Sequence, residues 1–293
     1  MSPMKETPLL FGPGRNLVGL WCEPEGGTPP AVCLLLVNAG VVHRIGLHRI
    51  NVKIARHMAG QGVPSLRLDL AGLGDSRIVG QAAGFREQAV GDIQAAMDHV
   101  ERTYDIHRFA IFGICSGAFN GYAAALADPR IVGLSMMDGH AFPSWKTPLM
   151  RHLQRLQVVS VGEVLAALRR RLAAPFQAGP KPPVADAVDT GGNEDNDPVV
   201  AATAAQFGQA LQTLVERGVA VHIVNTGSRI DDYSYAGQFM DVFGHHAFAA
   251  KVVSEYVPEM DHSVTLLSGQ RALIERLDRW MARLRPAARG AAA

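Results

Sequence analysis

This 293-residue chain is poor in three features that would each point to a particular class of protein. It has three cysteines, Cys22, Cys33 and Cys115, and their odd number and wide spacing argue against a disulfide framework and against a zinc site. Neither sign of charge dominates, because the formal net charge is +1, so we expect no nucleic-acid partner. No apolar stretch is long enough for a membrane span or a secretory signal. We therefore expect a soluble cytoplasmic protein.

Apolar residues are plentiful, at 48%, and they come in short runs. Runs that are apolar throughout, such as 31–40, are typical of strands buried on both faces, and they alternate with amphipathic stretches such as 85–104. This alternation predicts βαβ units and a mostly parallel sheet flanked by helices. The predicted strands are 31–40, 64–72, 108–115, 131–139, 220–227 and 250–257, and the predicted helices are 48–60, 85–104, 116–127, 199–217 and 270–284. An antiparallel hairpin is expected before them, from two apolar runs split by Gly12-Pro13-Gly14.

The regular alternation stops after Asp138 and resumes near residue 199. We expect residues 1–139 and 199–293 to form one α/β core, and residues 140–198 to be an inserted helical cap or lid. Within the cap, residues 177–198 are rich in Pro, Gly and Asp, so we expect a mobile loop there.

The sharpest motif is Gly113-Ile114-Cys115-Ser116-Gly117, at the junction of a predicted strand and a predicted helix. It matches G-x-S-x-G with cysteine in place of serine. A glycine two residues to either side lets the chain turn sharply and presents the central side chain at the carboxyl edge of the sheet. The turn also places that side chain at a helix N-terminus, where the helix dipole favours a thiolate. The plain alternative is a buried structural cysteine followed by a serine that caps the helix.

A cysteine nucleophile needs a base, and His262 is in the expected place, after the last predicted strand and before the last helix. An acid should orient this histidine. We prefer Asp231 to Asp232 in the loop after the strand 220–227. Asp138, which ends the strand after the nucleophile, is the rival. Each of these aspartates could equally be a turn or cap residue.

Two backbone N–H groups should stabilise the oxyanion of an acyl-transfer reaction, and one is the amide of Ser116, directly after the nucleophile. The other is expected from the loop after the first parallel strand, with Val41 as our choice of donor and Gly40 as the position that permits close approach. Asn38 and Ala39 of the same loop are expected to contact the substrate. The predicted chemistry needs no metal and no organic cofactor.

Together these residues resemble the α/β-hydrolase superfamily over nearly the whole chain. Residues 67–76, RLDLAGLGDS, resemble the superfamily's R-x-D-x-x-G-x-G-x-S turn. Residues 38–46, NAGVVHRIG, and the Cys-Ser pair at the elbow resemble a subgroup of bacterial hydrolases found beside exosortase systems. Dienelactone hydrolases are similar in using a cysteine nucleophile. The resemblance implies the α/β-hydrolase fold with a cap, and it departs at the acid loop, where Ile230 stands at the more usual position of the acid.

These features predict an esterase or thioesterase with a Cys-His-Asp triad and an acyl-cysteine intermediate. Two alternatives stay open. One is an acyltransferase that moves an acyl group from a coenzyme A or carrier-protein thioester to an amine or alcohol, and the other is an inactive binding module of the same fold. The expected partner is a small acyl substrate, free or bound to coenzyme A or a carrier protein. Arg169, Arg170 and Arg171 of the cap could bind the phosphates of such a donor, although a solvated face fits them as well, and a homodimer stays open.

Overall fold

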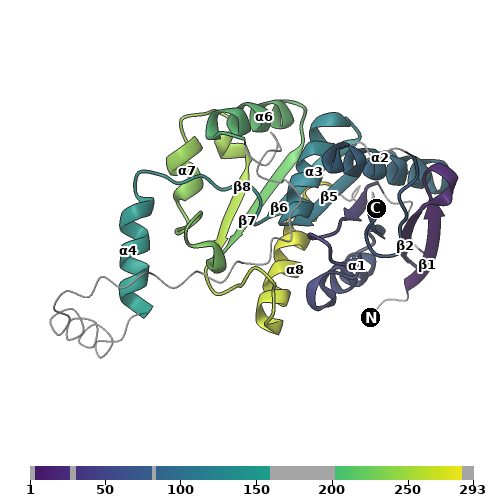
Figure 1. The fold of residues 1–293 in the computed structure, drawn as a ribbon, viewed down its shortest axis with the longest axis horizontal. Coiled ribbons are helices and arrows are strands. Elements are labelled where there is room, and N and C mark those ends of the chain that lie inside the picture. Colours follow the sequence, from purple (N-terminus) through teal and green to yellow (C-terminus); the bar gives the residue numbers. More distant parts are fainter. Residues whose placement is uncertain (1–3, 27–30, 81–83, 159–201, 286–293) are drawn as a thin grey trace, which may run out of the picture.

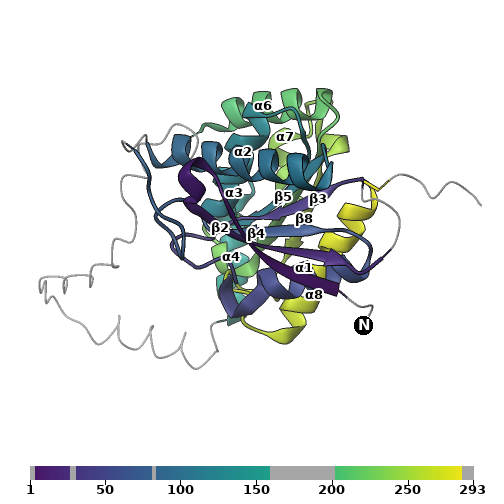
Figure 2. The ribbon, with the colours of Figure 1, turned by 90° about the vertical axis from the view of Figure 1, so that its right-hand side faces the viewer.

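The computed structural model describes residues 4–26, 31–80, 84–158 and 202–285. In these parts of the chain the strands make one sheet, and helices cover both of its faces (Figures 1 and 2). No helix among the described residues is long and apolar enough to cross a membrane.

The sheet has eight strands in the order β1-β2-β4-β3-β5-β6-β7-β8. The strands are β1 (Met4–Phe11), β2 (Leu17–Pro24), β3 (Cys33–Leu36), β4 (Ser65–Leu68), β5 (Phe109–Ile114), β6 (Ile131–Met137), β7 (Ala220–Thr226) and β8 (Val253–Val257). β1 pairs antiparallel with β2, and β2 pairs antiparallel with β4. Every pairing from β4 to β8 is parallel.

Two sets of helices cover the two faces of the sheet. The helices are α1 (Ile50–Gly60), α2 (Phe85–Tyr104), α3 (Ser116–Ala127), α4 (Thr147–Val158), α6 (Ala204–Glu216), α7 (Gln238–Phe243) and α8 (Leu267–Ala282). Buried side chains of α2, α3, α6 and α7 share one apolar core with the sheet, and those of α1 and α8 share the other (Figure 2).

The central strands are apolar throughout because both of their faces are covered. In β5, Phe109 and Ile111 belong to the core under α2, α3 and α6. The alternate residues Ala110 and Phe112 belong to the core under α1 and α8. Successive side chains of a strand point to opposite faces, so a strand between two helical layers needs an apolar residue at every position.

The structure confirms the predicted class of fold, including the antiparallel hairpin and the parallel sheet flanked by helices. Boundaries differ most where polar residues end a strand early. The strand predicted over 64–72 ends at Leu68, because Asp69 turns its carboxylate into a buried network instead of continuing the ladder. The helix predicted over 270–284 begins earlier, at Leu267, and α7 was not predicted.

The parallel pairing brings the loops that carry the candidate residues to one edge of the sheet. Loops that follow β3, β5, β6, β7 and β8 all leave from the carboxyl ends of neighbouring strands. The chain after β6 lies against the loop after β7, since Ser144 Oγ is 2.5 Å from Tyr235 Oη. It also reaches α7, where Lys146 Nζ donates to Asp241 Oδ1 at 2.9 Å.

Two glycine positions make the local packing testable. A Cβ atom at Gly117, in the first turn of α3, would lie 2.4 Å from the backbone oxygen of Asn38, which cannot move aside freely. We therefore expect Gly117→Ala to lower the free energy of unfolding by about 1–3 kcal/mol, the usual cost of overpacking. Gly91, in the middle of α2, has open space where a Cβ would stand.

Gly91→Ala is the matched control. It should raise the free energy of unfolding by about 0.5–1 kcal/mol, because alanine favours a helix interior over glycine. Urea denaturation of both variants measures the change in the free energy of unfolding, which should be negative for Gly117→Ala and positive for Gly91→Ala. Equal effects from the two substitutions would contradict the close approach of α3 to the loop after β3.

Candidate active site

Cys115 occupies a strained turn between β5 and α3. Its backbone φ of 55° and ψ of −120° lie where residues with side chains are rarely found. A Cβ at Gly113 would come within 2.2 Å of the backbone oxygen of Gly117, so the two flanking glycines permit the turn. The turn leaves Cys115 half-buried at the carboxyl edge of the sheet, which is the geometry of a nucleophile elbow.

The other two cysteines have ordinary structural surroundings. Cys22 and Cys33 are both buried. Burial raises the pKa of Cys22 to about 11 and raises that of Cys33 further. Among the three thiols, only that of Cys115 has its pKa lowered, which makes it the one suited to nucleophilic attack near neutral pH.

His262 connects Cys115 to a buried carboxylate. Its Nδ1 is 2.7 Å from Asp138 Oδ2, and its ring is the largest influence that lowers the pKa of the Cys115 thiol. The backbone N–H of His262 donates to Ser228 Oγ at 2.9 Å, which fixes the loop that carries the ring. With Nδ1 as donor to the carboxylate, the other ring nitrogen is left to exchange a proton with the thiol.

Asp138 is held in place by the next strand. Its side chain is fully buried, Oδ1 accepts from the Thr226 N–H at 2.8 Å, and Oδ2 accepts from Thr226 Oγ1 at 2.6 Å. The backbone oxygen of Asp138 accepts from Arg229 Nη1 at 2.9 Å. Three donors besides the histidine therefore fix this residue, so its carboxylate can orient the imidazole rigidly.

The preferred acid, Asp231, is wrong as the partner of His262, and its rival Asp138 takes that place. The side chain of Asp231 is 70% exposed and pairs loosely with Arg151 at 4.0 Å. Asp232 pairs with Arg229 instead, at 2.6 Å. Sequence spacing could not separate these residues, because the ends of β6 and β7 are neighbours at the same edge. Thr226, which supplies two of the hydrogen bonds to the acid, was not foreseen.

The pKa values of the cysteine and the histidine move in opposite directions. Hydrogen bonds to Asp138 and then to Cys115 raise the pKa of His262 to about 9. The hydrogen bond to His262 is the largest influence that lowers the pKa of Cys115, and the Ser116 amide adds to it. Both shifts favour a thiolate at Cys115 beside an imidazolium at His262.

The loop after β3 is joined directly to the elbow. Gly40 donates its backbone N–H to Ser116 Oγ at 2.6 Å, and the Val42 N–H donates to the Ala39 oxygen at 3.0 Å to close a turn. Ser116 is buried, so its hydroxyl serves this contact and does not compete with Cys115 for substrate. Since the Gly40 amide is already used, Val41, whose side chain is exposed, stays our prediction for the second oxyanion donor.

A second chain of serine, histidine and carboxylate lies inside the protein. Ser135 Oγ is 2.9 Å from His222 Nδ1, and His222 Nε2 is 3.1 Å from Glu255 Oε1. Ser135 and His222 are fully buried, and Trp280 stacks over the imidazole. No substrate could reach this serine, so the three residues join neighbouring strands and are not a second site.

His43, Asp69 and Asp75 are the one group of described residues close enough to share a metal ion. Arg44 Nη1 hydrogen-bonds both carboxylates, so a guanidinium already neutralises the position a cation would take. The geometry therefore favours an internal ion-pair network over a metal site.

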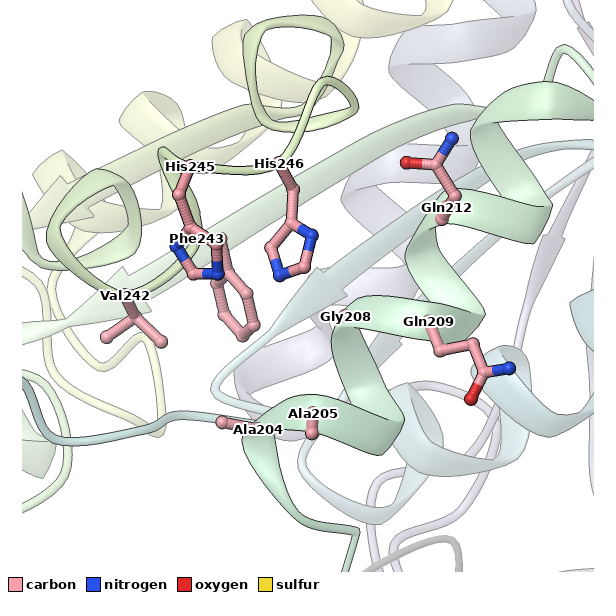
Figure 3. A pocket seen from close by; sticks show the side chains of 9 residues that line it. All are labelled: Ala204, Ala205, Gly208, Gln209, Gln212, Val242, Phe243, His245 and His246. Atoms are coloured by element: carbon pink, nitrogen blue, oxygen red, sulfur yellow. The ribbon is translucent and has the colours of Figure 1, made fainter.

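An open groove of about 590 Å³ lies between α6 and α7 (Figure 3). Its lining includes Gly208, Phe243 and His246, and none of Cys115, His262 and Asp138. Cys115, His262 and Asp138, and not this groove, therefore locate the candidate site. Arg169, Arg170 and Arg171 lie outside the described residues, as does most of the predicted cap, so their roles stay predictions.

No family model matches this sequence, and no curated protein matches it. Solved structures do resemble it. A lidless α/β serine hydrolase from Xanthomonas campestris aligns with a TM-score of 0.55 and 14% identity over 97% of both chains. The protein Est1E from Butyrivibrio proteoclasticus aligns with a TM-score of 0.56 and 14% identity over 94% of this chain and 98% of its own.

A candidate dienelactone hydrolase from Klebsiella pneumoniae aligns with a TM-score of 0.54 and 14% identity over 96% of this chain and 99% of its own. At these identities the similarity concerns the fold. Together with the strand order and the elbow, it assigns this chain the α/β-hydrolase fold.

The opposed pKa directions predict how Cys115 reacts with iodoacetamide. Because the pKa of Cys115 is lowered, its alkylation should remain fast at pH 7, where an ordinary thiol of pKa about 8.5 is mostly protonated. His262→Gln removes the partner that stabilises the thiolate, so the alkylation rate at pH 7 should fall and the midpoint of its pH dependence should move up towards that of a free thiol. Peptide mapping after timed alkylation measures the rate at each cysteine.

The control is Cys22, which should remain unlabelled in the folded protein because it is buried and its pKa is raised. An alkylation midpoint for Cys115 at or above that of a free thiol would contradict the ion pair with His262.

Proposed function

We propose that this protein cleaves esters or thioesters by acyl transfer through Cys115. His262 acts as the base and acid, and Asp138 orients His262 and stabilises its charged form. The observation that carries the proposal is a strained, half-buried cysteine whose thiol pKa is lowered by a histidine, which a fully buried aspartate holds at 2.7 Å. Support from the comparisons is that solved proteins of this fold include an esterase and a serine hydrolase.

In the first half of the reaction, the Cys115 thiolate attacks the carbonyl carbon and forms the S–C bond. The carbonyl oxygen becomes an oxyanion, which the amides of Ser116 and Val41 stabilise. The C–O or C–S bond to the leaving group then breaks, and the leaving group takes its proton from the His262 imidazolium. The product is an alcohol or thiol, and the acyl group remains on Cys115 as a thioester.

In the second half, neutral His262 removes a proton from water, whose oxygen attacks the acyl carbon. The S–C bond breaks, the Cys115 thiolate returns, and the carboxylic acid leaves. His262 ends as imidazolium beside the thiolate, so the enzyme returns to its starting state. The turnover rate should decline above about pH 9, because His262 then loses the proton that the leaving group needs.

The acyl-enzyme gives the most direct test of this proposal. Incubation with p-nitrophenyl butyrate should add one butyryl group to the intact mass, and peptide mapping should place it on Cys115. Cys115→Ala should abolish the adduct and turnover, because no other described thiol is both accessible and of lowered pKa. Cys22→Ala is the matched control and should retain both.

An adduct that survives in Cys115→Ala but disappears in Ser116→Ala would assign the nucleophile to Ser116. Product that forms faster with an added amine than with water would identify an acyltransferase. Wild-type protein that binds acyl esters without any adduct or turnover would indicate a binding module.

The identity of the acid is tested by three asparagine variants. Asp138→Asn keeps the shape of the side chain but removes the charge that stabilises the imidazolium, so kcat should fall by about 10³–10⁴-fold. Asp232→Asn and Asp231→Asn should each change kcat by less than about threefold, since their side chains pair with Arg229 and Arg151 at the surface. Steady-state kinetics on the same ester compares them, and a larger loss in Asp231→Asn would restore the sequence-based choice.

A further inference from the structure

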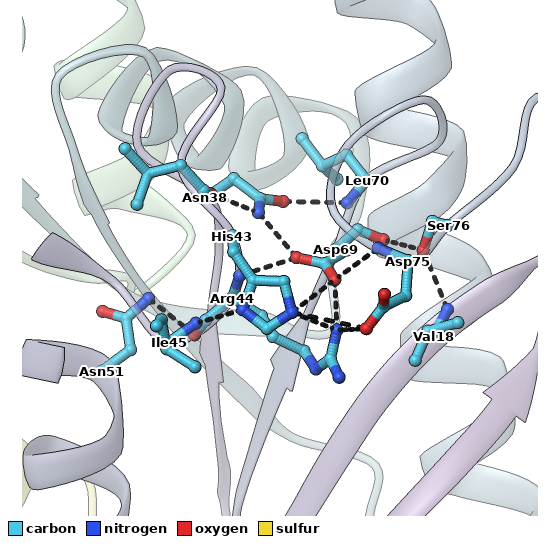
Figure 4. A network of polar contacts seen from close by, with 11 residues as sticks. Val18, Asn38, His43, Arg44, Ile45, Asn51, Asp69, Leu70, Asp75 and Ser76 are labelled. Atoms are coloured by element: carbon cyan, nitrogen blue, oxygen red, sulfur yellow. Dashed lines mark hydrogen bonds and ion pairs between the residues drawn. The ribbon is translucent and has the colours of Figure 1, made fainter.

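The carboxylate of Asp69 is surrounded by hydrogen-bond donors just beyond the end of β4 (Figure 4). Its side chain is fully buried. Oδ1 accepts from Asn38 Nδ2 at 2.9 Å and from the Arg44 backbone N–H at 2.6 Å. Oδ2 accepts from Arg44 Nη1 and from the Asp75 backbone N–H at 3.1 Å. One buried carboxylate thus receives four hydrogen bonds from three residues.

Two of those donors belong to opposite ends of the loop 38–44. Asn38 begins the loop, and its Nδ2 also donates to the Val42 oxygen at 2.8 Å inside it. Arg44 ends the loop, and both its backbone N–H and its guanidinium donate hydrogen bonds to Asp69 (Figure 4). Asp69 therefore fixes where the loop starts and where it finishes.

Between these fixed ends, the loop meets the elbow. The Gly40 N–H donates to Ser116 Oγ at 2.6 Å, and the backbone oxygen of Asn38 lies so near α3 that position 117 has no room for a Cβ. A shift of the loop would therefore move the backbone beside Cys115. Misplacement by about 1 Å in a reacting site costs about 10²-fold in rate.

We propose that Asp69 is a positioning residue for acyl transfer, which holds the loop 38–44 so that its backbone amide meets the oxyanion formed at Cys115. The inference rests on the proposed function and adds a residue to it that does not touch the substrate. The position of the Asp69 carboxylate also explains why residue 74 is a glycine. A Cβ at position 74 would lie 2.2 Å from Asp69 Oδ2 and would displace the carboxylate.

Both terminal atoms of the side chain at position 69 must accept hydrogen bonds, as the two oxygens of a carboxylate do. In Asp69→Asn, an amide NH₂ at the site of Oδ1 would face the donors of Asn38 and Arg44. Turned the other way, the NH₂ would face Arg44 Nη1 and the Asp75 N–H. Either orientation sets donors against donors in a buried site and loses two hydrogen bonds, so the loop should loosen.

The test separates acyl transfer from thiolate reactivity. Acylation of Cys115 by p-nitrophenyl butyrate passes through an oxyanion, whereas alkylation by iodoacetamide does not. We expect Asp69→Asn to lower kcat by about 10–100-fold, in the range for a misplaced or missing oxyanion donor, with KM changed less than about threefold. The rate of Cys115 alkylation should stay within about twofold of wild type, because the contact between Cys115 and His262 is untouched.

Asp75→Asn is the matched control. Asp75 Oδ2 accepts from the same Arg44 Nη1 at 2.7 Å, but its side chain is 60% exposed, and no hydrogen bond described for it reaches the backbone of the loop 38–44. Its removal should leave both rates within about twofold of wild type. Similar losses of kcat in both variants would mean that turnover depends on the ion pair with Arg44 and not on the hydrogen bonds that join Asp69 to the loop. That result would overturn the proposal.

Each remaining outcome is also decisive. Unchanged kcat in folded Asp69→Asn overturns the proposal, and so does an equal loss of acylation and alkylation, which would mean general damage to the elbow. If Asp69→Asn does not fold, Asn38→Ala tests the same link from the loop side and should show the same split between the two rates. A wild-type protein that alkylates at Cys115 but never acylates would overturn the proposed function and this inference together.

Discussion

The backbone at Cys115 is the constraint on which the site depends. A left-handed φ of 55° at a residue with a side chain is unfavourable, and it persists because the chain on both sides is fixed. On one side β5 is covered on both faces, and on the other α3 starts at once. The glycines at 113 and 117 remove the atoms that would prevent these two elements from meeting. Strain at one residue is thus balanced by packing spread over the core.

Two fully buried carboxylates organise the surroundings of this elbow in similar ways. Asp138 directly follows β6 and is surrounded by donors from Thr226 and His262. Asp69 follows β4 and is surrounded by donors from Asn38, Arg44 and Asp75. A buried carboxylate is stable only where donors compensate its lost hydration, so each one fixes its neighbours as firmly as they fix it. One orders the proposed base, and the other orders the loop proposed to hold the oxyanion.

The sequence was sufficient for those features that depend on local pattern. Apolar runs predicted the sheet, and the spacing of Gly113 and Gly117 predicted the turn at Cys115, because both follow from the geometry of a few consecutive residues. Which aspartate reaches His262 depends on a contact across 124 positions of the chain, so the adjacent ends of two strands left three candidates, of which the preferred one, Asp231, was wrong.

The hydrogen bonds between Asp69 and Arg44 were not predicted, for the same reason. Residues 69 and 44 meet only because β3 and β4 are neighbours in the sheet, although a helix separates them in the chain. The segment RLDLAGLGDS could be seen as a turn, yet its contacts belong to the tertiary structure. The cap, predicted from the interruption of the pattern at 140–198, stays a prediction beyond the described α4.

The placement of the three thiols has a consequence for oxidative damage. Cys33 opens β3 and pairs in register with Phe109, six residues before Cys115, so roughly 20 Å of strand separates the two sulfur positions. Cys22 lies at that same distant end, opposite Ser65 at the start of β4. A disulfide needs Cα atoms within about 7 Å. If peroxide oxidises Cys115 to a sulfenic acid, neither of the other two cysteines is near enough to form a disulfide with it. Reduction of Cys115 would therefore depend on an external thiol or other reductant.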